Sequence, residues 1–134
     1  MNTQIPLKFR ITAAIIHLIG SISPIISIPI TWLVWILTKE LHPLIDRSGK
    51  SALNFQSSLA LYLVAAIGIF GAVCGLSANN NIAGTIATLL AYPNFLIISI
   101  LGFASFSLPI IAAIFAIYGK VYSYPLTIRF YSEE

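Results

Sequence analysis

The sequence predicts an all-α integral membrane protein: a compact bundle of about four membrane-embedded helices, the first two short and forming a hairpin. Three observations lead to this prediction: the composition, the length of the uncharged apolar stretches and the positions of proline within them. Of 134 residues, 58% are hydrophobic and 8% are charged. Soluble domains carry roughly 25% charged residues, so a soluble domain is excluded. Disorder is excluded as well, because it requires low hydrophobicity and high charge.

Three apolar stretches, residues 11–38, 51–77 and 84–119, are separated by short polar segments. A bilayer core about 30 Å thick needs about 20 helical residues, so each stretch is long enough to be embedded. Backbone groups inside lipid must be paired within their own segment, so we expect helices rather than strands. The second stretch, residues 51–77, is expected to be one helix.

The first stretch is too long for one ordinary span and contains Pro24 and Pro29 in a serine-rich setting. Proline in a helix interior removes a hydrogen bond and clashes with the preceding turn. We therefore expect two short helices, at about 11–22 and 25–38, that form a hairpin. The sequence leaves open whether this hairpin crosses the bilayer twice or re-enters on the same side.

The third stretch is also long, and Tyr92-Pro93-Asn94 is expected to divide it. A short piece at about 83–92 would then precede a full span at about 94–119. The last 15 residues, 120–134, read as an aromatic cytoplasmic tail, since aromatic side chains gather at membrane interfaces. The whole chain, 1–134, is thus expected to be a single transmembrane domain.

The charges predict which way the chain faces. Lys and Arg stay on the cytoplasmic side of a membrane. If residues 11–38 enter and leave on one side, all seven basic residues become cytoplasmic and the uncharged Asn79-Asn80-Asn81 run faces outward. Both termini are then cytoplasmic, in a bacterial inner membrane or its equivalent. A surplus of three positive charges is too small for nucleic-acid binding, which requires clustered Lys and Arg.

Polar side chains at membrane depth are candidate functional residues by default. His17 lies in the first apolar helix, and we interpret it as a neutral side chain bonded to a serine such as Ser21 rather than as a ligand. Asn54 and Gln56 lie in the cytoplasmic half of the second span. They read as polar contacts between helices, with Asn54 bonded to a neighbouring helix or to the 39–50 loop. The alternative is a polar entrance to a transport pathway.

The distal half of the second span contains a small-residue face formed by Gly68, Gly71, Ala72 and Gly75. Gly71 and Gly75 match the GxxxG pattern, which lets helix backbones approach closely. We expect this face to pack within the chain, against small residues of the last span, and homodimerisation is the alternative.

Catalytic and cofactor motifs are not supported by the spacing of the residues. Arg47 to Ser51 resembles the end of a phosphate-binding loop, but Leu44 occupies a position that requires glycine. The single cysteine, Cys74, excludes a cysteine-based metal site. None of the four acidic residues lies within an expected span. We therefore expect no catalytic residue, no cofactor and no metal.

Two motifs resemble a known family. One is His42-Pro43-Leu44-Ile45-Asp46 with the following Gly49-Lys50 and Ala52–Gln56, and the other is the tail from Gly119 to Ile128. They are similar to motifs of small bacterial membrane proteins of unknown function related to the twenty-kilodalton membrane subunit of the chloroplast inner-envelope import translocon (Tic-type). The resemblance implies a bundle of about four membrane helices with both termini on one side. It also implies a shared polar cytoplasmic surface, whose candidate residues are His42, Asp46, Lys50, Asn54, Gln56, Tyr124, Pro125 and Arg129.

The function expected from these observations is that of a non-enzymatic interaction or assembly subunit, linked by the resemblance to protein translocation. The alternative is a small channel or transporter for ions or solutes. The expected partners are the lipid bilayer and a membrane protein or larger complex, with a homo-oligomer as a further option.

Overall fold

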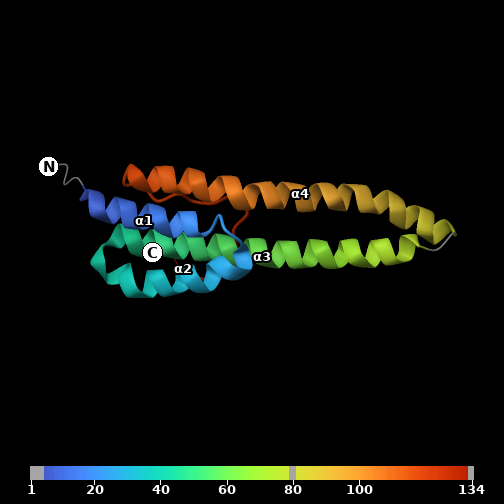
Figure 1. Cartoon of the computed structure of the whole chain (residues 1–134), viewed down its shortest axis with the longest axis horizontal. Coiled ribbons are helices and arrows are strands. Elements are labelled where there is room, and N and C mark those ends of the chain that lie inside the picture. The colour runs from blue at the N-terminus through green and yellow to red at the C-terminus, as the bar shows by residue number, and fades with distance from the viewer. Residues whose placement is uncertain (1–4, 79–80, 133–134) are drawn as a thin grey trace. The chain divides into compact units, whose positions relative to one another are not determined.

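A computed structural model describes residues 5–78 and 81–132 of the chain. The described residues form four α-helices, α1 (Leu7–Ile19), α2 (Pro24–Thr38), α3 (Pro43–Ser77) and α4 (Ile82–Ile117), and one 3₁₀ helix, η1 (Lys39–Leu41). No strand occurs in these two ranges. The all-helical class and the four helices that the sequence predicts are therefore confirmed (Figure 1).

The chain forms two compact units. Unit 1 contains residues 1–59 and 105–134, and unit 2 contains residues 60–104. The described part of unit 1 holds α1, α2, η1, the first half of α3, the end of α4 and the tail. Unit 2 holds the rest of α3 and the larger part of α4.

In unit 1, α1 and α2 contact each other across a short turn (Figure 1). α1 ends at Ile19, and the amide of Gly20 still donates to the carbonyl of His17. α2 begins at Pro24, which stands in the first turn, where proline needs no amide partner. Pro29 lies inside α2 without ending it.

Small side chains bring α1 and the end of α4 together. Ala13 and Ala14 of α1 form a buried cluster with Leu44, Ala113 and Ala116. Alanine at both faces lets two helix backbones approach closely, as is typical of membrane helices. The end of α4 thus finds its small-residue partner on α1.

α4 differs from the sequence expectation, because it runs without a break through Tyr92-Pro93-Asn94. The short piece 83–92 and the span 94–119 are therefore one helix. A proline removes one hydrogen bond, and apolar helices tolerate this loss where local adjustments satisfy the freed carbonyl. α3 likewise begins at Pro43, eight residues before the expected start at 51.

Two of the helices, α3 and α4, are long and apolar enough to cross a membrane. Only 17% of the most apolar part of α3 and 22% of that part of α4 are buried inside the protein. A core helix of a soluble protein would be mostly buried, so this exposure indicates a lipid environment. α1 and α2 have 13 and 15 residues, fewer than the roughly 20 needed for a span. Two helices could therefore span a membrane, and the expectation of four membrane-embedded helices is not confirmed.

Candidate functional site

Unit 1 buries a group of polar side chains beside its apolar core and exposes apolar side chains on its outer surface. Its buried polar residues are His17, Ser27, Thr31, Ser48, Ser51, Asn54, Gln56 and Ser58. Its exposed apolar residues on α2 include Ile25, Ile26, Leu33 and Leu37. Soluble domains bury apolar residues and expose polar ones. Polar side chains buried in a unit with exposed apolar ones depart from this pattern, and they make the interior of unit 1 the candidate functional site.

The side chain of Asn54 binds main-chain groups of the C-terminal tail. Its Oδ1 accepts from the amides of Phe130 at 2.9 Å and of Tyr131 at 2.8 Å, and its Nδ2 donates to the carbonyl of Tyr131 at 2.8 Å. The sequence predicts a contact with a helix or with the 39–50 loop, and the structure shows the tail instead. A carboxamide offers both donors and an acceptor, so it can pair with a peptide group on both sides.

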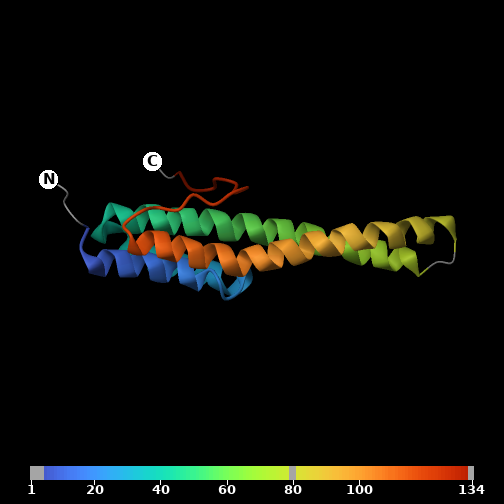
Figure 2. The ribbon, with the colours of Figure 1, turned by 90° about the horizontal axis from the view of Figure 1, so that it is seen from above.

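Two serines extend this contact along the same face of α3. The hydroxyl of Ser51 donates to the carbonyl of Tyr122 at 2.7 Å, and the hydroxyl of Ser58 accepts from the amide of Ile128 at 2.8 Å. Ser51, Asn54 and Ser58 are spaced by three and four residues, so they lie on one face of a helix. This spacing is a signal present in the sequence, and it is missed when each polar residue is considered singly. Figure 2 shows the tail running out along α3 and back.

Tyr124 fixes the middle of the tail inside unit 1. Its ring stacks on Phe55 with centroids 4.2 Å apart, and its hydroxyl lies 2.9 Å from Nδ1 of His17. Burial raises the pKa of the Tyr124 hydroxyl above its ordinary value, and the nearby Tyr122 adds to this effect. The hydroxyl therefore keeps its proton and forms a hydrogen bond with Nδ1 of His17. The expected bond between His17 and Ser21 is not formed, because Ser21 donates to the carbonyl of Leu18.

Gln56 joins α3 to α2 at a point where α1 is also close. Its Nε2 donates to the hydroxyl of Thr31 at 3.0 Å. A Cβ at Gly20 would lie 2.7 Å from the same Nε2, so the glycine lets the amide approach α1. Gln56 thus serves as a contact between helices, as the sequence predicts. Its Oε1 and Nε2 of His17 are buried without a hydrogen-bond partner among the described residues.

An ion pair lies in the first turns of α3. Nζ of Lys50 lies 2.8 Å from Oδ2 of Asp46, and Oδ1 of Asp46 accepts from the indole of Trp35 at 2.9 Å. A Cβ at Gly49 would overlap the ring of Trp35. Gly49 therefore allows close packing, which gives the sequence around it a structural role.

The predicted polar cytoplasmic surface is not one surface. Asn54, Gln56 and Tyr124 are buried, and His42, Asp46 and Lys50 are half-buried. His42 stacks on Phe9 and accepts from the amide of Leu44. Pro125 and Arg129 are exposed. The expectation failed because α3 turns its polar face toward the tail rather than toward solvent.

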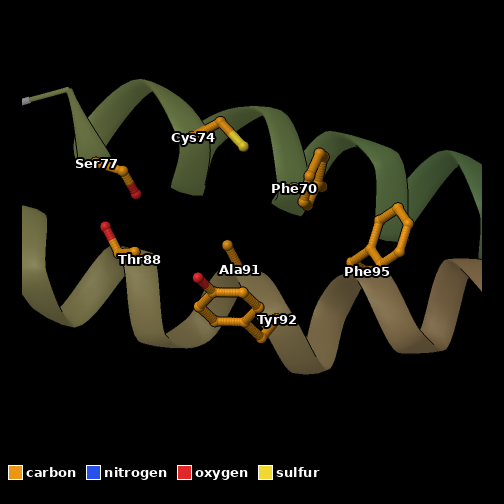
Figure 3. A pocket seen from close by; sticks show the side chains of 7 residues that line it. All are labelled: Phe70, Cys74, Ser77, Thr88, Ala91, Tyr92 and Phe95. Atoms are coloured by element: carbon orange, nitrogen blue, oxygen red, sulfur yellow. The ribbon is translucent and has the colours of Figure 1, made fainter.

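The small-residue face of α3 does not pack within its unit. A Cβ added to Gly68, Gly71 or Gly75 would meet nothing within 4 Å, and Ala72 is exposed. The expected packing against the last span is therefore not formed. In unit 2 the helices face each other elsewhere, around a cavity of about 390 Å³ (Figure 3). Its lining is Phe70, Cys74, Ser77, Thr88, Ala91, Tyr92 and Phe95.

A family model decides what kind of protein this is. The model of the magnetosome magnetite crystal formation protein family, MamF/MmsF, matches residues 8–131. The chain belongs to this family. No curated protein and no solved structure matches the chain.

The MamF/MmsF match corrects the resemblance to the translocon-related family. It covers both motifs on which that resemblance rested and nearly the whole chain. In the structure Asn54 and Tyr124 of these motifs hold the tail, so they serve the fold. The link to protein translocation therefore has no support. Within residues 5–78 and 81–132, no group of three or more His, Cys, Asp or Glu side chains is placed to hold a metal ion.

Proposed function

We propose that this chain is a non-enzymatic integral membrane protein that acts as an assembly component of the membrane in which magnetite crystals form. The link to magnetite crystals rests on the description of the family, and the link to a membrane rests on the two long apolar helices. One observation carries the proposal: the chain separates its charges from its most apolar part. Residues 60–104 contain no Asp, Glu, Lys, Arg or His, so all seven basic residues belong to unit 1.

The dimensions of unit 2 support a transmembrane hairpin. Residues 60–77 of α3 and 82–104 of α4 extend over about 27 and 35 Å at 1.5 Å per residue. These lengths match a hydrocarbon core of about 30 Å. Both ends of the chain belong to unit 1. The positions of the basic residues support a cytoplasmic side for unit 1 and both termini in this proposal.

The exposed apolar side chains of unit 1 support a partial immersion of the α1–α2 hairpin. Ile25 is 79% exposed and Leu37 is 71% exposed. Exposed patches of this kind mark contact with a membrane or a partner. The hairpin is too short to cross, so in this proposal it lies in the cytoplasmic leaflet.

The contacts of the polar core support an architectural role over catalysis. Asn54, Ser51 and Ser58 bind main-chain groups of the tail, and Gln56 binds α2. These groups are engaged in holding the chain together. The outer surface is therefore the part that meets other molecules.

Purification from native membranes tests this function. We expect the tagged protein, isolated in mild detergent, to retain a defined set of membrane proteins. In magnetite-forming cells, loss of the chain should change crystal size or number in electron micrographs. An Asn54→Leu chain should fail to restore the crystals, and an Asn94→Leu chain should restore them. A protein recovered reproducibly alone, in cells whose crystals do not change, would contradict the proposal.

The channel or transporter remains the second candidate, because Nε2 of His17 and Oε1 of Gln56 are buried polar atoms without a described partner. Such groups inside a membrane protein mark solute pathways in other cases. Reconstitution in vesicles with a flux assay separates the two functions. The assembly role predicts no flux above that of empty vesicles, whereas a pathway predicts flux that His17→Phe abolishes.

A further inference from the structure

The tail reverses direction in a turn at Pro125 and Leu126, called the tip below, and the backbone conformation of Leu126 in this turn is unfavourable for its side chain. Leu126 has φ 54°, and it is the only non-glycine residue with positive φ in the described ranges. This left-handed region suits glycine and is costly for a residue with a large side chain. Leu126 is also 88% exposed, the highest value among the large apolar residues of the described chain. Strain combined with exposure singles out this side chain.

Both flanks of the turn are fixed, so the strain cannot relax. Tyr124 on one side is held by Phe55 and His17. Ile128 on the other side donates its amide to Ser58. Pro125 presets the backbone before Leu126. A strained residue persists where its surroundings over-determine it, and such residues gather at functional positions.

The hydrogen bonds between the tail and α3 show toward which end of α3 the turn lies. Tyr122 lies at the level of Ser51, Ile128 at that of Ser58, and Tyr131 at that of Asn54. The tail therefore advances along α3 by about 10 Å, turns, and comes back (Figure 2). The turn lies at the Ser58 end of this path, the end at which the uncharged part of α3 begins.

We propose that Leu126 inserts into the acyl boundary of the cytoplasmic leaflet of the bilayer that α3 crosses. The inference rests on the membrane placement given above for α3. Phe130, 54% exposed, adds apolar surface next to the turn. Arg129 is exposed between them and fits anionic headgroups. All charged residues of the chain belong to unit 1, seven basic and four acidic, and this net positive charge favours an anionic lipid surface over a basic or neutral protein partner.

A fluorescent label at the tip tests this insertion. In the full-length protein reconstituted into vesicles of mixed zwitterionic and anionic phospholipid, Cys74 is replaced (Cys74→Ala), Leu126→Cys is introduced, and an environment-sensitive dye is attached. Lipids with a nitroxide on the acyl chain quench from the membrane side, and iodide quenches from water. We expect strong nitroxide quenching and weak iodide quenching at position 126.

Ser123 provides the matched control, because it is exposed on the same tail near the level of Ser51. Ser123→Cys in the same background should show the reverse pattern, with nitroxide quenching several-fold weaker than at 126. Equal iodide quenching at both positions would overturn the insertion. A label on the native Cys74 reports on unit 2. If nitroxide lipids fail to quench it, the membrane placement of α3 is wrong rather than the insertion of the turn.

Leu126→Gly separates the lipid contact from the fold. Glycine relieves the positive φ, so the detergent-solubilised variant should unfold at the same or a higher temperature than the native chain. In vesicles, a dye at Ser132→Cys, also in the Cys74→Ala background, should become more accessible to iodide when Leu126→Gly is added, because the tip no longer anchors the tail. If the variant loses stability in detergent and the dye does not respond in vesicles, Leu126 serves the fold alone.

Discussion

Units 1 and 2 are both rich in apolar residues, yet they differ in how their side chains bond. In unit 1 Asn54 reaches Tyr131, which lies 77 residues later, and His17 reaches Tyr124, which lies 107 residues later. In unit 2 the hydroxyls of Thr88 and Ser99 return to carbonyls of their own helix four residues earlier. Unit 1 is therefore specified by polar contacts between distant segments.

Unit 2, like the outer surface of unit 1, exposes large apolar side chains to its surroundings. Its exposed side chains include Ile82 at 81% and Phe103 at 74%. Water would make such a hairpin unstable, whereas lipid removes the cost of exposing it. The comparison teaches that one chain can combine a unit defined by hydrogen bonds with a unit defined by its solvent. Substitutions of the same type in both units test this difference.

The largest effect is expected at Asn54. Asn54→Leu removes the three hydrogen bonds to the tail described above and leaves peptide groups of Phe130 and Tyr131 unpaired. We expect the free energy of unfolding to fall by about 2–4 kcal/mol, from roughly 1 kcal/mol for each bond. Amide exchange at residues 128–131 should accelerate strongly, which mass spectrometry of the protein in detergent measures.

Asn94 of unit 2 is the matched control for Asn54. It is buried on α4, and its Oδ1 lacks a hydrogen-bond partner in the described part of the chain. Asn94→Leu replaces an unpaired polar atom by an apolar one, so stability should stay constant or rise. Equal losses at the two positions would contradict the division of the chain into a bonded unit and a lipid-dependent unit.

Two glycines give the next largest effect. Gly49→Ala drives a methyl group into the ring of Trp35, and such overpacking costs about 1–3 kcal/mol. Gly71→Ala meets nothing within 4 Å and should raise helix stability by a few tenths to about 1 kcal/mol. Thermal unfolding in detergent, followed by circular dichroism, compares the two. A loss at Gly71 as large as that at Gly49 would show that its face is packed.

The glycines also show what could be predicted from the sequence. Composition and Pro24 were sufficient for the helical class and for the break between the first two helices. The cost of Pro93 depends on whether its surroundings satisfy one carbonyl, and the residues alone do not contain this information. The spacing of Gly71 and Gly75 describes a face that can pack, but not what lies opposite it. The pairing of Asn54 with the tail joins segments 77 residues apart, which no local pattern records.

Substitution of Tyr124 is expected to have a smaller effect on stability, and this effect depends on pH. The pKa of the Tyr124 hydroxyl is raised above the ordinary value of 10.0 in the folded chain. Its contribution to stability is therefore complete below pH 10, and it decreases as the pH rises above 10 because the unfolded chain then loses this proton first. Tyr124→Phe should cost about 1 kcal/mol at neutral pH through the lost bond to His17. The stability of the variant should also fall less between pH 10 and pH 11 than that of the native chain. The unfolding temperature, measured as a function of pH for both proteins, checks this. An unchanged slope would show that other groups cause the fall.

The smallest effect is expected at the ion pair of Asp46 and Lys50. Both side chains are partly exposed, at 27% and 21%, and lie four residues apart on α3. Exposed pairs of this kind contribute about 0.3–0.5 kcal/mol, because water and salt screen the charges. Lys50→Gln should therefore shift the unfolding temperature little, and 0.5 M salt should remove the difference. Asp46→Asn should cost more than Lys50→Gln, because Asp46 also accepts from Trp35, and a bond to a charged acceptor is stronger than one to a neutral acceptor. If Lys50→Gln cost more stability than Asp46→Asn, the charge of Lys50 would interact with a group other than Asp46. The polar contacts of unit 1 would then extend beyond the segments that bond in this structure.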